Sequence, residues 1–140
     1  MNQLEKLWES VKKAEAALLA TSADGSVTMR TVSPVYYRDA ILIFTCSKSQ
    51  KYQQMKANPN CCVEIGGYFV EAKPEFLGLT MLDENAALRE VYAEKFTDAF
   101  DEDAVYGGRK AEFVLLKPVR VKSWMIENGA PTGPFEHEFS

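Results

Sequence analysis

The chain has 140 residues, of which 46% are hydrophobic and 26% charged, so one packed domain spanning residues 1–140 is expected. Its net charge of −4, without a long run of one sign, argues against an extended nucleic-acid surface. No apolar run approaches the ~20 residues needed to cross a bilayer, and the N-terminus lacks an apolar signal core. We therefore expect a cytoplasmic protein that contacts neither nucleic acid nor membrane.

The cysteine and histidine content argues against a metal centre. The three cysteines are Cys46, Cys61 and Cys62, and the single histidine is His137. An odd number of cysteines without a secretory signal favours free thiols. Adjacent Cys61 and Cys62 point to opposite faces of a strand, so they neither pair readily nor share a metal. We expect no metal site.

The first elements in chain order are a helix and three strands. Apolar residues at helical spacing from Leu4 to Val11 predict an amphipathic helix. The strands are predicted at Ala16 to Ser22, Val27 to about Tyr37, and Ala40–Thr45, with tight turns at Asp24-Gly25 and Arg38-Asp39. Short turns between consecutive strands predict an antiparallel meander. The uniformly apolar third strand is expected to be buried on both faces.

The second half of the chain is predicted to alternate helices with further strands. A helix of about Ser49–Asn58 ends at Asn58-Pro59, and Asp83 caps a helix that runs to about Phe100. Strand segments are predicted at Cys61 to Ile65, Tyr68–Glu71, Glu75–Thr80, Ala111–Leu116 and Val119–Met125, and an irregular tail from Glu127 to Ser140. Six or seven strands with three helices indicate a small antiparallel barrel with peripheral helices.

The junction after the third strand has the composition of an anion site. Hydroxyls and lysines follow Ile43 within Ile43–Lys51, where the first free N–H groups of a helix point outward. Phosphate is the natural occupant of such a helix start. The alternative is a capped surface helix, because Ser47 and Gln50 stand at capping-box spacing. Lysines 48, 51 and 56 would then simply face water.

Arg30 lies in the middle of the second predicted strand, on the face of Thr28 and Val32. A guanidinium in this position needs a partner. A ligand phosphate at the junction would supply one, and an internal carboxylate such as Glu64 would serve equally well. No phosphate-binding loop, Rossmann turn, nucleophile elbow or catalytic triad is present.

In order along the chain, four motifs resemble those of the pyridoxamine 5′-phosphate oxidase-like family of FMN-binding split barrels. Arg30-Thr31-Val32 resembles the Arg-x-Val strand, and Phe44-Thr45 resembles the aromatic-Thr strand end. Ser49-Gln50-Lys51 with Asn58-Pro59 is similar to the phosphate-gripping Ser-Arg-Lys…Asn-Pro stretch, and Val121-Lys122-Ser123-Trp124 is similar to the late tryptophan strand. The resemblance spans roughly residues 17–124.

This resemblance implies a mainly β fold with peripheral helices (α+β), a six- to seven-stranded antiparallel split β-barrel of the FMN-binding type. It implies a homodimer with FMN at the subunit interface and Trp124 reaching the flavin of the other subunit. The implied FMN-binding residues are Arg30, Thr31, Val32, Ser33, Phe44, Thr45, Ser49, Gln50, Lys51 and Trp124.

The departures from the oxidase indicate which members are nearest. Gln50 replaces a second phosphate-binding arginine, and the C-terminal Arg-Leu-His-Asp-Arg substrate signature is absent. The short general-stress-protein-like members therefore match better than a true oxidase. We expect a flavin-dependent oxidoreductase or flavin reductase that uses NAD(P)H, with catalytic residues and substrate unassigned. The alternatives are a non-catalytic flavin-binding or redox-sensing stress protein, a haem-binding split barrel using His137, and a true pyridoxamine-phosphate oxidase.

Overall fold

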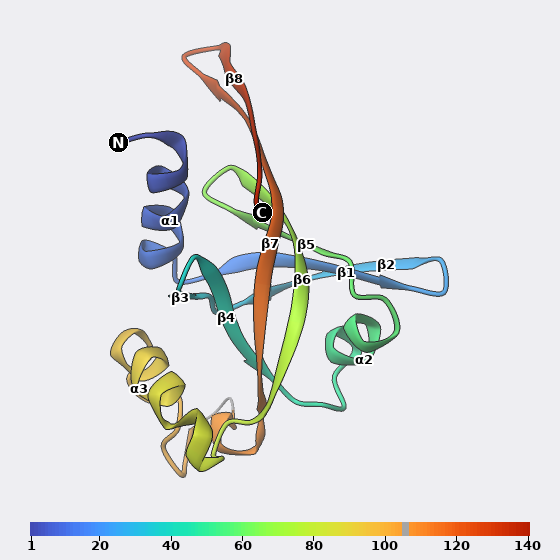
Figure 1. Cartoon of the computed structure of the whole chain (residues 1–140), viewed down its shortest axis with the longest axis vertical. Helices are drawn as coiled ribbons and strands as arrows, with labels where there is room; N and C mark the ends of the chain where they lie inside the picture. Colours follow the sequence, from blue (N-terminus) through green and yellow to red (C-terminus); the bar gives the residue numbers. More distant parts are fainter. Residues whose placement is uncertain (105–106) are drawn as a thin grey trace.

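The computed structural model describes residues 1–104 and 107–140, and Figure 1 shows its arrangement. The helices are α1 (Gln3–Lys13), α2 (Gln50–Ala57) and α3 (Ala86–Lys95), with short 3₁₀ turns η1 (Asp83–Asn85) and η2 (Gly108–Lys110). The strands are β1 (Ala17–Ala23), β2 (Ser26–Val32), β3 (Val35–Tyr37), β4 (Ala40–Thr45), β5 (Cys61–Ile65), β6 (Tyr68–Leu79), β7 (Glu112–Glu127) and β8 (Ala130–Glu138). None of the helices in these ranges is long and apolar enough to span a bilayer.

The strands form an antiparallel sheet in the order β2-β1-β5-β6-β7-β4-β3, and β8 pairs with β7. Strands β2 and β3 are consecutive in the chain yet lie at opposite ends of this order. The single strand predicted from Val27 to Tyr37 is therefore wrong, because it breaks at Ser33-Pro34, where proline has no N–H for a ladder. The predicted meander is replaced by two pairings, β1 with β2 and β3 with β4.

The buried side chains form two clusters, one on each side of β4. Ile41 and Ile43 belong to the larger cluster, which packs beneath α1. Leu42 belongs to the smaller cluster with Leu88 and Tyr92 of α3. Burial of β4 on both faces is therefore confirmed, and its alternating side chains supply both clusters. Figure 1 shows α1 and α3 on one side of the long strands and α2 on the other.

Strands β6 and β7 are each continuous where the sequence predicted two segments. Pro118 is accommodated because the ladder shifts register between Glu71 and Ala72, the residue opposite it. The prediction of an irregular tail is also wrong, since β8 pairs with β7 and carries its prolines on an outer strand. The β7–β8 hairpin projects beyond the rest of the molecule (Figure 1).

The predicted turns are confirmed, and one predicted helix is shorter. Asp24-Gly25 and Arg38-Asp39 have positive φ angles, as two-residue hairpin turns require. The predicted helix from Asp83 to Phe100 was wrong at both ends. Asp83 begins a 3₁₀ turn without a side-chain cap, and α3 ends at Lys95 because Phe96 leaves the helical region.

Candidate functional site

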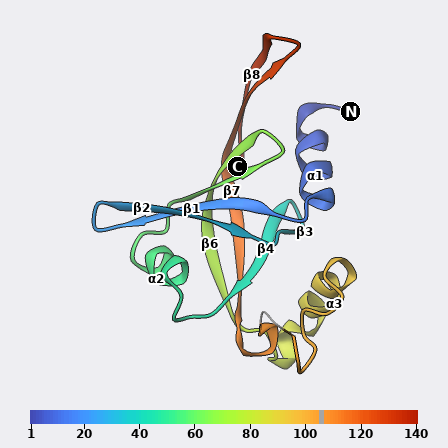
Figure 2. The same ribbon diagram turned by 180° about the vertical axis from the view of Figure 1, so that it is seen from behind.

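The site is built on the β1–β2 hairpin and on α2, which lies beside it in Figures 1 and 2. The hairpin register pairs Leu19 with Arg30 and Thr21 with Thr28. Side chains of directly opposed residues share one face of a sheet. The Arg30 guanidinium therefore lies beside two threonine hydroxyls, on the face that α2 covers.

Arg30 is half-buried and is held by neutral groups. Its Nη1 donates to the Leu19 carbonyl at 3.2 Å and to the Thr21 hydroxyl at 2.6 Å, and its Nη2 donates to the Thr28 hydroxyl. These bonds engage three of the five N–H donors of a guanidinium. The two remaining donors, on Nε and Nη2, lie along one edge. That edge is the fork that binds two oxygens of a phosphate or carboxylate.

Gln54 of α2 fixes the two threonines in turn. Its Oε1 accepts hydrogen bonds from the hydroxyls of Thr21 and Thr28, each at 2.6 Å. Because both hydroxyls give their proton to Gln54, they present only oxygen lone pairs to Arg30. The orientation of the guanidinium is thus set by one helix and two strands.

No carboxylate neutralises Arg30 within the described residues, because the ion pairs found there involve other basic side chains. Glu64, an alternative partner considered from the sequence, accepts from the Gly67 amide at 3.0 Å instead. Burial lowers the pKa of the Arg30 guanidinium, the direction expected for a cation without a countercharge. An anion from outside the chain would supply that countercharge.

The start of α2 adds a second cation and free amides. Ser49 caps the helix, since its Oγ accepts from the Tyr52 amide at 3.3 Å and lies 2.9 Å from the Thr45 hydroxyl. The cap is therefore Ser49 and not Ser47, whose carbonyl accepts from Gln53. The first amides of the helix, at Gln50 and Lys51, have no intrahelical acceptor.

Lys51 shares the electrostatic environment of Arg30. Burial is the main cause that lowers the pKa of the Lys51 ammonium, and the positive charge of Arg30 lowers it further. Cys46 acts in the opposite direction. The alternative in which Lys51 simply faces water does not hold, because this side chain is half-buried beside a second cation. Two neighbouring cations and a helix start have the charge and the donors that a doubly charged anion would need.

The remaining predicted residues divide between the strand edge, the core and a distant face. Thr31 and Ser33 are exposed, and Val32 is buried in the larger cluster. Phe44 packs its ring 4.9 Å from that of Tyr92, within the smaller cluster. The Gln50 side chain faces solvent.

Trp124 is 56% exposed on β7, four strands from β2 in the sheet order. At about 4.8 Å per strand this is roughly 20 Å along the sheet. One chain therefore does not bring Trp124 to Arg30.

The backbone of β2 is open along one side, because β2 ends the strand order. In a two-residue hairpin the residues flanking the turn, here Ala23 and Ser26, form a hydrogen-bonded pair, and such pairs alternate along the ladder. Arg30 and Val32 then direct their backbone groups to β1. Thr31 directs its N–H and C=O to the open side, where a planar ligand with donors and acceptors along one edge would meet them.

His137 lies away from this site. It pairs with Val121 in the β7–β8 ladder, and its ring packs 4.9 Å from that of Phe139. Within residues 1–104 and 107–140, no cluster of three or more His, Cys, Asp or Glu side chains is arranged to hold a metal ion.

The sequence reasoning missed Thr21, Thr28 and Gln54. Thr28 shares a strand face with Arg30, and counting back from the Asp24-Gly25 turn places Thr21 opposite Thr28. Both residues were therefore open to prediction from the hairpin register. Gln54 was not, because its role depends on how α2 packs against β1.

The amino-acid sequence itself matches no family model and no curated protein. The fold, however, is shared with solved structures. A FAD-binding protein from Mesorhizobium loti superposes with a TM-score of 0.65 at 20% identity, covering 86% of this chain and 92% of that chain. General Stress Protein 26 from Bacillus anthracis superposes with a TM-score of 0.68 at 13% identity, covering 99% of this chain and 100% of that chain.

A haem-binding protein from Mycobacterium smegmatis gives a TM-score of 0.72 at 14% identity and covers 99% of this chain. The match spans only 58% of that longer protein. At these identities the likeness establishes a shared fold. The expected fold class, a split barrel of the pyridoxamine 5′-phosphate oxidase-like type, is thereby confirmed.

The variant Gln54→Glu tests the anion site. A carboxylate at the Gln54 position would lie one hydroxyl away from Arg30 and supply the missing countercharge. With FMN, the ligand expected from the sequence, as the probe, affinity should fall about tenfold or more, measured by fluorescence titration. Ala57→Glu adds the same charge to an exposed position at the other end of the same helix and should change affinity little. Equal losses in both variants would mean that net charge alone sets the affinity.

Proposed function

We propose that this protein binds FMN at the site formed by β1, β2 and the start of α2. The observation that carries the proposal is the half-buried Arg30, which leaves one two-donor edge free and has no carboxylate partner within the described residues. A terminal phosphate matches this edge in shape and charge. Lys51 would supply the second positive charge, and Ser49 with the first helix amides would complete the hydrogen bonds.

The open edge of β2 indicates the chemistry of the rest of the ligand. The pyrimidine edge of a flavin ring presents both a hydrogen-bond donor and acceptors. The N–H and C=O of Thr31 would complement it as a neighbouring strand would. The FAD-binding neighbour from Mesorhizobium loti supports a flavin. The monophosphate FMN fits a site built around one terminal phosphate.

We assign the protein to the flavin-dependent oxidoreductases or flavin reductases that use NAD(P)H. When bound, the flavin supplies two-electron chemistry with hydride from a nicotinamide donor. The chain itself would fix the phosphate through Arg30 and Lys51, and orient the ring along β2. The motifs and the geometry assign no protein group as an acid, base or nucleophile.

The absorption spectrum tests this assignment. We expect purified protein to be yellow, or to become so with added FMN, and its visible bands to bleach anaerobically with NADH or NADPH. Protein that ignores FMN would overturn the proposal. Bound flavin that neither nicotinamide reduces would instead favour a non-catalytic flavin-binding stress protein, the alternative supported by the likeness to General Stress Protein 26.

Haem is the other cofactor with a specific observation behind it, namely the haem-binding neighbour. His137 is the one histidine able to ligate iron in this chain. Haem titration of wild type and His137→Ala separates the two cofactors. A Soret band shift lost only in the variant would favour haem over flavin.

We further propose that a second copy of the chain covers the outer face of the sheet. Leu18 lies opposite Glu64, which lies opposite Phe69, so these side chains share one face. Several large apolar side chains are exposed on this face: Leu18, Val27, Met29, Phe69, Val119, Trp124 and Ile126. Such a face favours a protein partner, and a symmetric pair could bring Trp124 to the partner's flavin site.

Met29→Glu tests the homodimer. Met29 is 61% exposed, so a glutamate costs little in one chain but opposes burial at an apolar interface. Sedimentation should give twice the chain mass of 15.7 kDa for wild type and a monomer for Met29→Glu. Leu82→Glu, at an exposed loop position away from this face, should remain dimeric. A monomeric wild type would exclude the dimer.

Lys51→Ala tests the second cation. Loss of a charge-assisted hydrogen bond should weaken FMN binding about 10–100-fold, whereas Lys48→Ala, which removes an exposed charge from the same junction, should have little effect. Because the pKa of Lys51 is lowered, its positive charge is lost at lower pH than for an ordinary lysine. Wild-type affinity should therefore decline with rising pH already below the ordinary lysine pKa of 10.5, and Lys51→Arg should remove the decline. An unchanged dissociation constant in Lys51→Ala would exclude this contact.

A further inference from the structure

The connector between β2 and β3 is held by helix α3. The hydroxyl of Tyr92 donates to the Ser33 carbonyl at 2.9 Å, and the Lys95 ammonium donates to the Pro34 carbonyl at 2.6 Å. Ser33 and Pro34 lie outside both strands, so their carbonyls lack ladder partners. Two residues one helical turn apart on α3 thus take two consecutive carbonyls of the connector.

Tyr92 is itself immobilised. It is 2% exposed, and its ring packs within about 6 Å of the rings of Phe44, Phe96, Phe100 and Phe113. Burial raises the pKa of its hydroxyl well above the ordinary tyrosine value, so that hydroxyl is protonated and can donate at neutral pH. The hydrogen bond to Ser33 is therefore made by a side chain with little freedom to move.

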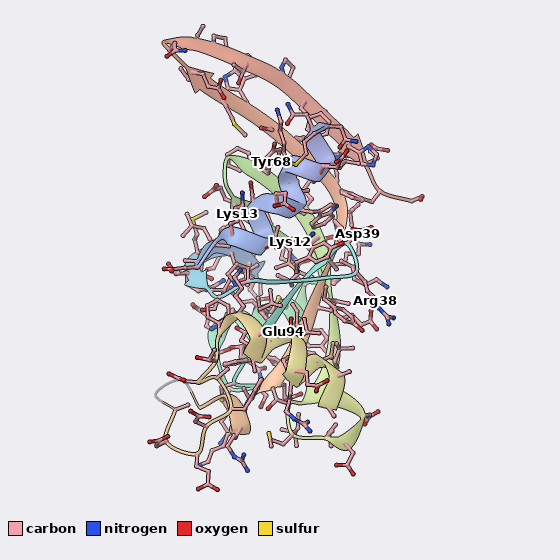
Figure 3. The ribbon with its side chains drawn as sticks, turned by 90° about the vertical axis from the view of Figure 1, so that its left-hand side faces the viewer. Lys12, Lys13, Arg38, Asp39, Tyr68 and Glu94 are labelled. Carbon is pink, nitrogen blue, oxygen red and sulfur yellow. The ribbon has the colours of Figure 1, made fainter. Side chains whose placement is uncertain are left out.

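The hydrogen bonds from Tyr92 and Lys95 to the connector are called the clamp. Lys95 joins a third element to it. Its ammonium also donates to the Val11 carbonyl of α1 at 2.9 Å, one of the carbonyls that a helix end leaves unpaired. Figure 3 looks onto this side of the molecule, with Lys12 at the end of α1 above Glu94 of α3. One half-buried cation therefore ties α1, α3 and the connector together.

We propose that Tyr92 and Lys95 are positioning residues that fix the open edge of β2. The clamped carbonyl of Ser33 lies two residues from Thr31, whose backbone groups face the open side. The connector also carries the chain from one edge of the sheet to the other. Its position therefore sets the width of the gap between β2 and the opposite edge of the sheet. This inference rests on the proposed function for the identity of the ligand, whereas the hydrogen bonds of the clamp lie within the chain itself.

Flavin binding gives the first test, with matched pairs of variants. Tyr92→Phe and Lys95→Met should each weaken FMN binding about 3- to 10-fold. They should also alter the visible circular dichroism of bound FMN at saturation, because the ring edge then meets a displaced Thr31. Tyr68→Phe removes a comparable hydroxyl bond, to Gln3, and Lys13→Met removes an exposed lysine from α1. Both controls should keep wild-type affinity and dichroism, and Lys95→Arg should restore both.

Amide hydrogen exchange without flavin gives the second test. Peptides covering residues 29–37 should exchange about 3- to 10-fold faster in Tyr92→Phe and Lys95→Met, while peptides from β5 stay unchanged. Unchanged exchange in residues 29–37 would overturn the clamp even in a protein that binds FMN. If the wild-type protein binds no flavin but the two variants still exchange faster in residues 29–37, the flavin site is refuted and the clamp is supported. Variants whose exchange rises everywhere would show a general loss of stability, which also contradicts the proposal.

Discussion

The site depends on one half-buried guanidinium whose protein partners are all neutral. Hydroxyl and carbonyl oxygens orient Arg30 without cancelling its charge, so the charge remains available to an anion. A carboxylate in their place would neutralise the guanidinium within the chain and weaken its attraction for an anion. Gln54 places an amide at the position where a carboxylate would supply the countercharge to Arg30. The chemistry of a single side-chain terminus thus decides between an internal ion pair and a binding site.

The split in the barrel and the site arise from the same feature of the chain. Strand β2 ends the sheet because Pro34 carries the chain across to the opposite edge, and this leaves backbone groups of β2 unpaired. An open strand edge usually invites aggregation. Here β2 stands beside two cations and a helix start, so a charged planar ligand can pair with the edge instead. Helix α3 limits the open segment by occupying the carbonyl of Ser33.

The sequence was sufficient to predict structure where the pattern is local, and insufficient where segments distant in the chain meet. Turns at Asp24-Gly25 and Arg38-Asp39, and the buried strand β4, follow from short-range rules. Strand β8 does not, because pairing with β7 overrides a composition of proline and glycine. Arg30 and Lys51 were predicted from a mid-strand position, the strand-to-helix junction and the order of motifs. Gln54, Tyr92 and Lys95 were not, since their contacts span 26 to 84 residues of the chain.

The ladder between β4 and β7 has a consequence for how the molecule forms. Its partners, such as Ile41 and Leu116, are far apart in the chain, whereas the β1–β2 hairpin joins near neighbours. Long-range pairing must overcome loop-closure entropy before its contacts stabilise the chain. The threonine–arginine arrangement of the hairpin therefore has a short route to assembly. Closure of the barrel around it joins segments far apart in the chain, and proteins dominated by such pairing fold in about milliseconds to seconds.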